Sequence, residues 1–415
     1  MNKLSVAALA VAALLGGGSA AQAYELNVVH WWTSGGESAA VNVFAKEFDA
    51  NGQDHWVDGA IADGATARAA IMQRVLGGDP PGAAQFNPGR EYEELISNDL
   101  LLDLADVAKA DNWDAVIRPP GIAAACHVDD HWWCVPVNIH SWNWAWASIP
   151  AFKAAGLELP KNFDEFLAGA PKLKEAGIIP FAIGGGQGGW QVAGAFGVIQ
   201  TSELGLADRE KLLKDHDMTV AMGEKQKAAL TVFKGLKQFT DDGYAPRNWN
   251  DTTALVVQDK AAIQIMGDWA RGEFGVAGEK AGVDYDCLAM PIDAPTVSTD
   301  GDVFVFPKQS DPAAEAAQKR LAALMISPRV QALFNNAKGS MPVRDDVDMS
   351  LADPCMIKGL SIIKDPANIQ IAGGRWLNED TNNQINALMT QFFSDDAMSV
   401  DEAQQKYADI IKNAQ

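Results

Sequence analysis

Positive charge is scarce in this 415-residue sequence. It contains 33 lysines and arginines against 54 aspartates and glutamates, which gives a formal net charge of -21. Because nucleic acids and anionic membrane surfaces attract basic proteins, this balance argues against both as partners. The hydrophobic content of 48% is too high for a disordered chain and allows a sizeable core, and the length suits roughly two domains.

Long apolar runs are also scarce. The one pronounced run, residues 6–15, follows Lys3 and precedes a small-x-small cleavage pattern at 21–23, which is typical of a secretory signal peptide. The run is short for a bilayer span, so we expect cleavage before Tyr24 rather than a retained anchor. No cysteine lies near the cleavage site, which argues against a lipoprotein. We therefore predict that residues 1–23 direct export to the periplasm and are removed.

Motifs of common enzymes are missing as well. The sequence has no serine nucleophile elbow, no His-Glu-x-x-His and no nucleotide-binding fingerprint. One enzymatic alternative stays open, because glycoside hydrolases combine a carboxylate pair with a tryptophan-lined cleft, and Glu37 with Asp302 could form such a pair. We predict a protein that is not an enzyme and uses no cofactor, with a secreted glycoside hydrolase as the alternative.

Cysteine is rare, but its number is even. Cys126 and Cys134 flank an Asp-Asp turn between two apolar segments, which predicts a hairpin closed by a disulfide in an oxidising compartment. Cys287 and Cys355 then pair with each other by elimination, although three connectivities are possible. The alternative is a zinc site that also uses the two histidines between the first two cysteines.

Tryptophan, in contrast, is abundant, with 13 in the chain. Trp31 and Trp32 follow a short apolar strand and precede Thr-Ser-Gly-Gly, a helix start that places Glu37 in the first helical turn. In open α/β sheets, ligands bind beyond the carboxyl ends of strands. Adjacent indoles, hydroxyls and a carboxylate at such a place suit a polar ligand with flat apolar faces, such as a sugar. The alternative is that one indole packs into the core.

Strands and helices alternate along the remaining chain. Strands are expected at 56–61, 83–86, 135–140 and 261–266, and the segments between them contain helical patterns. This alternation predicts a parallel sheet covered by helices on both faces, and hence an α/β fold.

Several other aromatic residues lie at predicted strand ends or in loops. Indole faces stack on the C–H faces of pyranoses, and placed polar groups bind the hydroxyls. Trp190 closes a glycine-rich loop that allows close backbone approach to a ligand or serves as a flexible connector. Trp142, Trp144 and Trp146 alternate, which favours a buried sheet face for most of them. The candidate site residues are Trp31, Trp32, Glu37, Gln85, Asn87, Trp190, Trp249, Trp269, Asp302, Lys338 and Trp376.

Four segments in a fixed order resemble the extracellular solute-binding proteins of ABC sugar importers, most closely the glucose/mannose-binding branch. They are His-Trp-Trp-Thr-Ser-Gly-Gly-Glu at 30–37, Val-Pro-Val-Asn-Ile-His at 135–140, Gln-Ile-Met-Gly-Asp-Trp-Ala at 264–270, and Lys-Gly-Ser-Met-Pro-Val-Arg at 338–344. Each segment alone is a weak signal, but together they extend over nearly all the mature chain.

The resemblance implies a periplasmic binding protein type 2 fold, in which two α/β lobes joined by a hinge close on a sugar. It implies lobes formed by 24–138 with 290–340 and by 139–289 with 341–415. It also implies that most of the candidate residues line the site, that Trp190 belongs to the second-lobe tryptophan loop, and that the partner is an ABC permease. A monomer is expected.

Two departures from the glucose-like pattern concern the ligand. A lysine of that pattern is absent where 83–86 runs into Asn87, and a histidine is absent near 371–376. Arg90 and Arg375 lie close to these places, and either one could face the cleft or form a surface salt bridge. We expect a neutral hexose or small glycoside, or an acidic sugar if one of these arginines faces the cleft.

Overall fold

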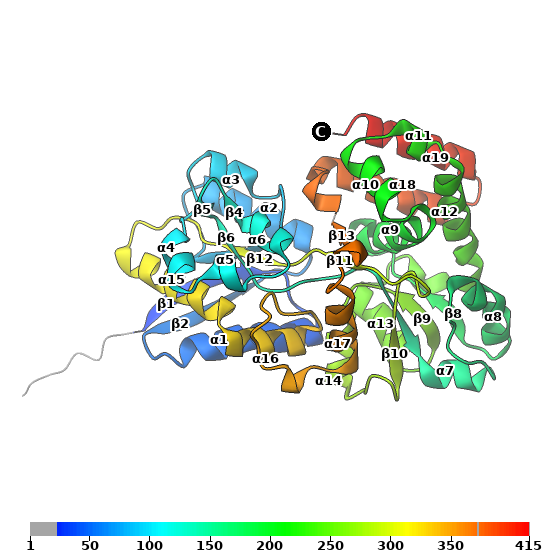
Figure 1. The fold of residues 1–415 in the computed structure, drawn as a ribbon, viewed down its shortest axis with the longest axis horizontal. Helices are drawn as coiled ribbons and strands as arrows, with labels where there is room; N and C mark the ends of the chain where they lie inside the picture. Colours follow the sequence, from blue (N-terminus) through cyan, green and yellow to red (C-terminus); the bar gives the residue numbers. More distant parts are fainter. Residues whose placement is uncertain (1–22, 372, 415) are drawn as a thin grey trace, which may run out of the picture.

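The computed structural model describes residues 23–371 and 373–414, which form two α/β lobes side by side (Figure 1). The predicted signal segment lies outside the described residues, except for Ala23. Blue, cyan and yellow segments make up one lobe, and green to red segments make up most of the other, so the chain passes between the lobes more than once. Among the described helices, none is both long and apolar enough to cross a membrane.

The first lobe contains a five-stranded mixed sheet. In spatial order its strands are β2 (Asp54–Ala60), β1 (Tyr24–His30), β3 (Ala83–Phe86), β12 (Val303–Val305) and β6 (Cys134–Pro136). β1 is parallel to β2 and β3, but β12 is antiparallel to β3 and β6. The prediction of a purely parallel sheet is therefore wrong, because β12 returns from the second lobe and enters the sheet in the opposite direction.

Helices cover both faces of this sheet. Ser34 and Glu37 form a capping box at the start of α1, as the Thr-Ser-Gly-Gly-Glu pattern predicts. The helix then packs its buried aromatic face against the last helix of the lobe. The helices are α1 (Gly35–Asp49), α2 (Gly64–Leu76), α3 (Glu93–Ser97), α4 (Ala105–Ala110), α5 (Trp113–Val116), α6 (Pro120–Cys126), α15 (Pro312–Ile326) and α16 (Pro328–Lys338).

The second lobe contains a four-stranded sheet. Its spatial order is β10 (Tyr285–Ala289), β7 (Trp144–Ser148), β9 (Ala261–Ile265) and β8 (Ile179–Ala182). Only β8 and β9 are parallel. Trp144 and Trp146 are buried on β7, as the alternation predicts, whereas Trp142 precedes the strand. The predicted strand at 135–140 is shorter than expected, because only β6 forms and the following residues connect the two lobes.

The helices of the second lobe include several that the sequence pattern did not predict, such as the one that starts at Trp190. They are α7 (Ile149–Ala154), α8 (Phe163–Glu175), α9 (Trp190–Leu204), α10 (Leu206–Lys214), α11 (Met218–Ala221), α12 (Glu224–Gly235), α13 (Trp249–Val257), α14 (Ala270–Ala277), α17 (Pro354–Ile362), α18 (Glu379–Ser394) and α19 (Val400–Lys412). Asn162 caps α8 through a hydrogen bond from the Glu165 amide.

Short bridges hold the connecting segments together between the lobes. Ile139 pairs with Met341, and His140 pairs with Asp300. Nearby, β11 (Val297–Thr299) and β13 (Ile369–Ile371) form a two-stranded sheet that Figure 1 shows between the lobes. The paired segments bring residues that are far apart in sequence to the same place.

Helix α14 also packs against α1, across the boundary between the lobes. A side chain at Gly36 would not fit there, because its Cβ would lie 2.5 Å from the carbonyl carbon of Gly272. The Gly36 amide instead donates a 2.8 Å hydrogen bond to Glu273 Oε1. This close approach brings the loop at the start of α1 next to the loop before α14.

Both predicted disulfides are confirmed. Cys126 pairs with Cys134, beside the small hairpin of β4 (His127–Val128) and β5 (His131–Trp132). Cys287 on β10 pairs with Cys355 on α17. The zinc alternative is wrong, because both thiols of the first pair are used in the disulfide.

Candidate ligand-binding site

The cleft between the lobes is a cavity of about 620 Å³ with residues of both lobes in its walls. The loops after β1, β3 and β9 contribute to it, which matches the rule that ligands bind beyond the carboxyl ends of strands. The predicted site residues that line it are Trp31, Trp32, Glu37, Asn87, Trp190, Trp249, Trp269, Asp302 and Lys338.

Gln85 and Trp376 were also predicted to contact the ligand, but neither lines the cleft. Gln85 is fully buried on β3, where its Nε2 donates to Asp302 Oδ1 at 2.7 Å and its Oε1 accepts from the Trp31 amide at 3.0 Å. Trp376 packs against the core of the second lobe. Gln85 therefore positions two lining residues from behind, because its side chain points into the sheet core.

A buried charged network forms the floor of the cleft. His140, from the segment after β6, places Nδ1 2.5 Å from Asp268 Oδ1 and Nε2 2.8 Å from Asp302 Oδ2. Asp268 follows β9 of the second sheet, and Asp302 precedes β12 of the first sheet. Asn138 also donates to Asp302, at 2.8 Å. One imidazole thus links the carboxylates of two sheets.

The charges of this network stabilise one another. Burial alone would lower the pKa of His140, but the carboxylates of Asp268 and Asp302 outweigh it and raise the pKa to about 9. Burial alone would raise the pKa of Asp302, but His140, Lys338 and the hydrogen bond from Asn138 lower it to about 2. At neutral pH the floor therefore contains an imidazolium between two carboxylates.

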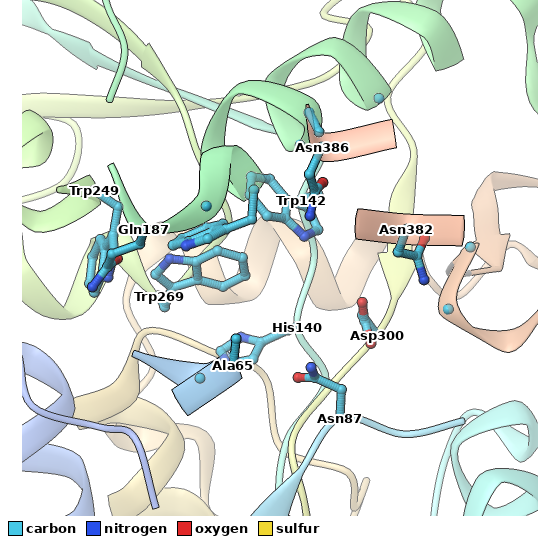
Figure 2. A pocket seen from close by; sticks show the side chains of 18 of the residues that line it. Ala65, Asn87, His140, Trp142, Gln187, Trp249, Trp269, Asp300, Asn382 and Asn386 are labelled. Carbon is cyan, nitrogen blue, oxygen red and sulfur yellow. The ribbon is translucent and has the colours of Figure 1, made fainter. Parts of the chain in front are cut away.

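Tryptophan rings form one wall above this floor. Trp142 meets Trp269 edge-on at 4.9 Å between ring centroids, and Trp190 lies 5.6 Å from Trp142. Trp269 also meets the ring of His140 edge-on at 5.1 Å. Edge-to-face contacts of this kind fix the rings relative to one another. Figure 2 shows Trp142, Trp249 and Trp269 gathered on the same side of the pocket.

Lys338 and Glu37 meet beside this wall. Lys338 Nζ lies 3.6 Å from Glu37 Oε1 and above the rings of Trp32 and Trp269, at 5.5 and 5.9 Å from their centroids. Glu37 Oε2 accepts from the amides of Thr33 and Ser34. Both charged groups are thus fixed by the end of α16 and the start of α1, and both line the cleft.

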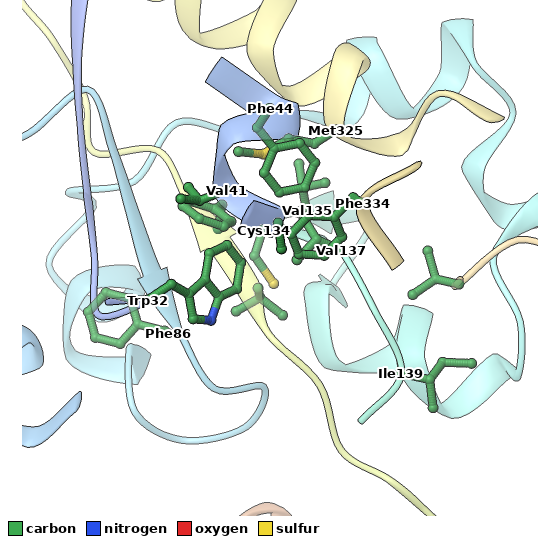
Figure 3. Packing of buried hydrophobic residues seen from close by; sticks show 14 of the residues in the cluster. Trp32, Val41, Phe44, Phe86, Cys134, Val135, Val137, Ile139, Met325 and Phe334 are labelled. Carbon is green, nitrogen blue, oxygen red and sulfur yellow. The ribbon is translucent and has the colours of Figure 1, made fainter. Parts of the chain in front are cut away.

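Trp32 is largely a core residue, although it also lines the cleft. Its side chain is 1% exposed and lies 5.6 Å from Phe304 and 5.4 Å from Phe334 between ring centroids. Figure 3 shows it among the buried aromatic and aliphatic residues of the first lobe. The alternative noted for the tryptophan pair therefore applies to Trp32, and Trp31 is the more exposed of the two, with Arg68 at 5.6 Å from its ring.

The opposite end of the cleft is polar. It is formed by the loop after β3, by α10, by the segment around Asp300 and by α18. Figure 2 shows Asn87, Asp300 and Asn382 on the side away from the tryptophans. Burial raises the pKa of the Asp300 carboxyl to about 6, and burial lowers the pKa of Arg209 to about 10.

The glycine-rich loop at 184–189 packs mainly against the protein itself. A Cβ on Gly185 would lie 2.7 Å from the carbonyl oxygen of Ala245, and one on Gly189, where φ is 79°, would meet Thr390 of α18. Only Gln187 and Gly188 of this loop line the cleft. The glycines are therefore needed for close packing of neighbouring segments rather than for a flexible connection.

The carboxylates proposed for a glycoside hydrolase do not fit that role. Asp302 accepts hydrogen bonds from Gln85 and Asn138 and pairs with His140, and its low pKa prevents it from acting as a general acid at neutral pH. Glu37 caps α1. Both carboxylates are fixed by the fold.

Several lining residues were missed at the sequence level. His140 lies within one of the four matched segments and Trp142 within the alternating tryptophans, so both had a signal. Arg209 had none, because it lies in a highly charged stretch that is typical of an exposed helix face. Asn382 and Asn386 are one turn apart on α18, a spacing that becomes meaningful only when the helix is placed against the cleft.

The comparisons with known proteins agree with this architecture. The family model of the bacterial extracellular solute-binding proteins matches residues 32–332. A "Probable sugar-binding periplasmic protein" of Rhizobium meliloti (strain 1021) is 37% identical over 367 residues, which cover 88% of this chain and 86% of that protein.

Two solved structures share the fold. The bacterial solute receptor AcbH, described as having an exclusive preference for β-D-galactopyranose, matches with a TM-score of 0.79 at 17% identity and covers 94% of this chain and 98% of its own. Maltose-bound MalE3 of T. maritima matches with a TM-score of 0.77 at 17% identity, over 94% and 99%. These likenesses support the two-lobe fold. With the family match, they confirm the resemblance noted in the sequence: the chain belongs to the bacterial extracellular solute-binding proteins, which are substrate-binding components of ABC transporters and not enzymes.

Proposed function

We propose that this protein binds a sugar in the cleft and delivers it to the permease of an ABC importer. The observation that carries the proposal is the wall of Trp142, Trp190 and Trp269 above a fixed polar floor. Flat indole faces stack on the C–H faces of a pyranose, while Glu37 and Lys338 provide an acceptor and donors for its hydroxyls. The Rhizobium relative is itself named a probable sugar-binding periplasmic protein.

The protein acts outside the cytoplasm. Its family is extracellular, and the Rhizobium relative is named as periplasmic. A cleaved signal at 1–23 would account for export. We propose that the protein works as a monomer, because a two-lobe cleft needs no second subunit to enclose a small ligand.

Closure of the lobes supplies the mechanism of capture. We propose that the lobes consist of 24–138 with 290–340 and of 139–289 with 341–415, and that they rotate about the paired connecting segments. The site contains side chains from both sides of this boundary, so a bound sugar that contacts both favours the closed state. Ligand binding shifts the population toward the closed state, and the permease would recognise the protein in that state.

Calorimetry and product analysis test the proposal together. The mature protein is titrated with monosaccharides and oligosaccharides, and the same mixtures are assayed for new reducing ends. We expect heat of binding and no turnover. Sustained release of reducing ends would contradict the proposal in favour of a hydrolase.

A thermal-shift panel identifies the class of sugar. A ligand that binds only the folded state at a hundredfold excess over Kd stabilises it by roughly 2.7 kcal/mol, which is readily visible as a shift in the melting temperature. We expect neutral hexoses or hexose-containing glycosides to give the largest shifts. Shifts confined to sugar acids or sulfonates would show that the neutral assignment is wrong.

A further inference from the structure

The polar end of the cleft contains charged groups that the fold leaves incompletely paired. Arg209 of α10 faces the cavity, and its Nε has no hydrogen-bond partner among the described residues. Its Nη1 reaches only the carbonyl oxygen of Ile371, at 3.4 Å. Within the described chain it forms no ion pair with a carboxylate. A buried guanidinium in this state is costly unless another group pairs with it.

Asp300 carries the opposite charge and is also incompletely paired. Its carboxylate also lines the cleft, but the side-chain hydrogen bond found for it within the described chain comes from the amide of its neighbour Gly301, at 3.0 Å. The negative charge of Asp300 supports the positive charge of Arg209, yet the two side chains do not form a direct ion pair. Both side chains line the same cavity.

A neutral pair of hydroxyls satisfies both groups at once. One hydroxyl donates to the Asp300 carboxylate, and its neighbour accepts from the Arg209 guanidinium. An anion would pair with Arg209 but would face Asp300, and a cation would do the reverse. Two adjacent hydroxyls are what a sugar ring presents.

The polar end lies apart from the tryptophan wall. Figure 2 shows Asp300 and Asn382 on the opposite side of the pocket from Trp249 and Trp269. The cavity of about 620 Å³ is within the range that accommodates ligands of drug-like size, which gives room for more than one sugar ring.

We propose that the physiological ligand is a neutral disaccharide or longer sugar, whose first unit stacks on the tryptophans and whose second unit places a vicinal diol between Arg209 and Asp300. This inference rests on the proposed sugar-binding function and specifies the ligand of the same site. Arg209 and Asp300 are then residues that determine ligand length.

Paired titrations of the full mature protein test it. The probes are glucose, galactose and mannose, the neutral disaccharides built from them, and glucuronic and galacturonic acid. We expect at least one disaccharide to bind about tenfold or more tightly than either of its component sugars, because hydrogen bonds to charged groups have about this effect. Arg209→Gln and Asp300→Asn should each remove this advantage and leave monosaccharide affinity within about twofold.

Lys211→Gln is the matched control, because Lys211 lies on the same helix and pairs with Asp208 outside the cleft. It should leave both affinities unchanged. Circular dichroism and the ligand-free melting temperature establish that each variant is folded. If Arg209→Gln does not fold, Asp300→Asn provides the same comparison from a different segment.

Three results would overturn the inference, and only the last of them would also overturn the proposed sugar-binding function. Monosaccharides that bind as tightly as disaccharides, with no differential effect of the two variants, would remove the second unit but keep the proposed function. Binding of uronic acids alone, strengthened by Asp300→Asn, would replace the diol with an anion. A folded protein that binds none of the sugars would overturn the proposed function as well.

Discussion

Asp302 and Asp300 lie two residues apart in the cleft but have different surroundings. Asp302 accepts hydrogen bonds from Gln85 and Asn138 and pairs with His140, and these contacts lower its pKa to about 2. Burial raises the pKa of Asp300 to about 6, and its side chain accepts a hydrogen bond from its own neighbour only, as far as the described residues extend. One carboxylate is stabilised by the fold and the other is not.

The difference separates two kinds of polar residue in the same cavity. A buried polar group that is fully paired contributes to the stability and shape of the site. A buried group with unused capacity reduces stability in the free protein and has more to gain from a ligand. Lining a cleft therefore does not by itself identify a ligand contact, and the pairing of each side chain has to be considered.

The largest expected effect concerns the contribution of Asp302 to folding stability, compared with that of Asp300. Asp302→Ala should reduce the free energy of unfolding by about 3–5 kcal/mol, because it leaves the buried imidazolium of His140 with one carboxylate fewer. Asp300→Ala should not reduce it, since Asp300 has little pairing to lose and burial disfavours its charged form. Urea unfolding of the ligand-free protein measures both. Equal destabilisation by the two substitutions would contradict the distinction.

The next effect concerns the aromatic wall. Trp269→Ala should reduce sugar affinity by about 1–3 kcal/mol, with stacking on nucleobases as the guide to the size of the effect. Trp376→Ala is the control, because Trp376 packs against the second-lobe core outside the cleft. Calorimetric titration with the best sugar of the panel measures both. If Trp269→Ala binds like the wild type, the ring has a structural role only.

The pH dependence of stability should distinguish the two carboxylates. Burial raises the folded-state pKa of Asp300 to about 6, above its unfolded value of about 4. Its contribution to stability is therefore fully present below pH ~4 and is lost as the pH rises through about 6. For Asp302, with a lowered pKa, the contribution is present above pH ~4 and is lost as the pH falls towards about 2.

Asp300→Asn should remove the first of these changes. Relative to this variant, the wild type should lose roughly 1–2 kcal/mol of unfolding free energy between about pH 4 and pH 7, after allowance for the partial exposure of the side chain. Urea unfolding at both pH values measures the difference, because groups that do not interact with Asp300 contribute equally in both proteins. Parallel pH profiles of the two proteins would show that Asp300 is not destabilised when charged.

Much of the fold could be predicted from local sequence patterns. Local pattern predicts the strand at 83–86 and the start of α1, because hydrophobic period and capping residues act within a few positions. The mixed direction of the first sheet could not be predicted this way. The direction of β12 depends on where the chain re-enters the lobe, which is a property of the whole topology.

The site was predictable where it depends on loops at strand ends. Trp31 directly follows β1 and Trp269 lies in the loop after β9, so local order indicates their position. Arg209 and Asn386 lie on helices whose placement depends on packing of the second lobe, and no local pattern marks their cleft-facing side. Gln85 shows the opposite problem: it lies at a strand end, but the pleat directs its side chain into the core.

The smallest expected effects concern the two arginines that the sequence indicated as candidates for binding an acidic sugar. Arg90 lines the cleft but is partly exposed, and its Nε donates to both carboxylate oxygens of Glu93, at 3.2 and 3.3 Å. Arg375 does not line the cleft and donates to the carbonyl oxygen of Gly121. Because exposed ion pairs contribute little, Arg90→Ala should change sugar affinity by less than about 1 kcal/mol, and Arg375→Ala should leave it unchanged. The measurement is calorimetric titration with a neutral disaccharide and with a uronic acid. A loss of uronic acid binding in Arg90→Ala, with disaccharide binding intact, would show that Arg90 recognises an anion and would restore the acidic-sugar alternative.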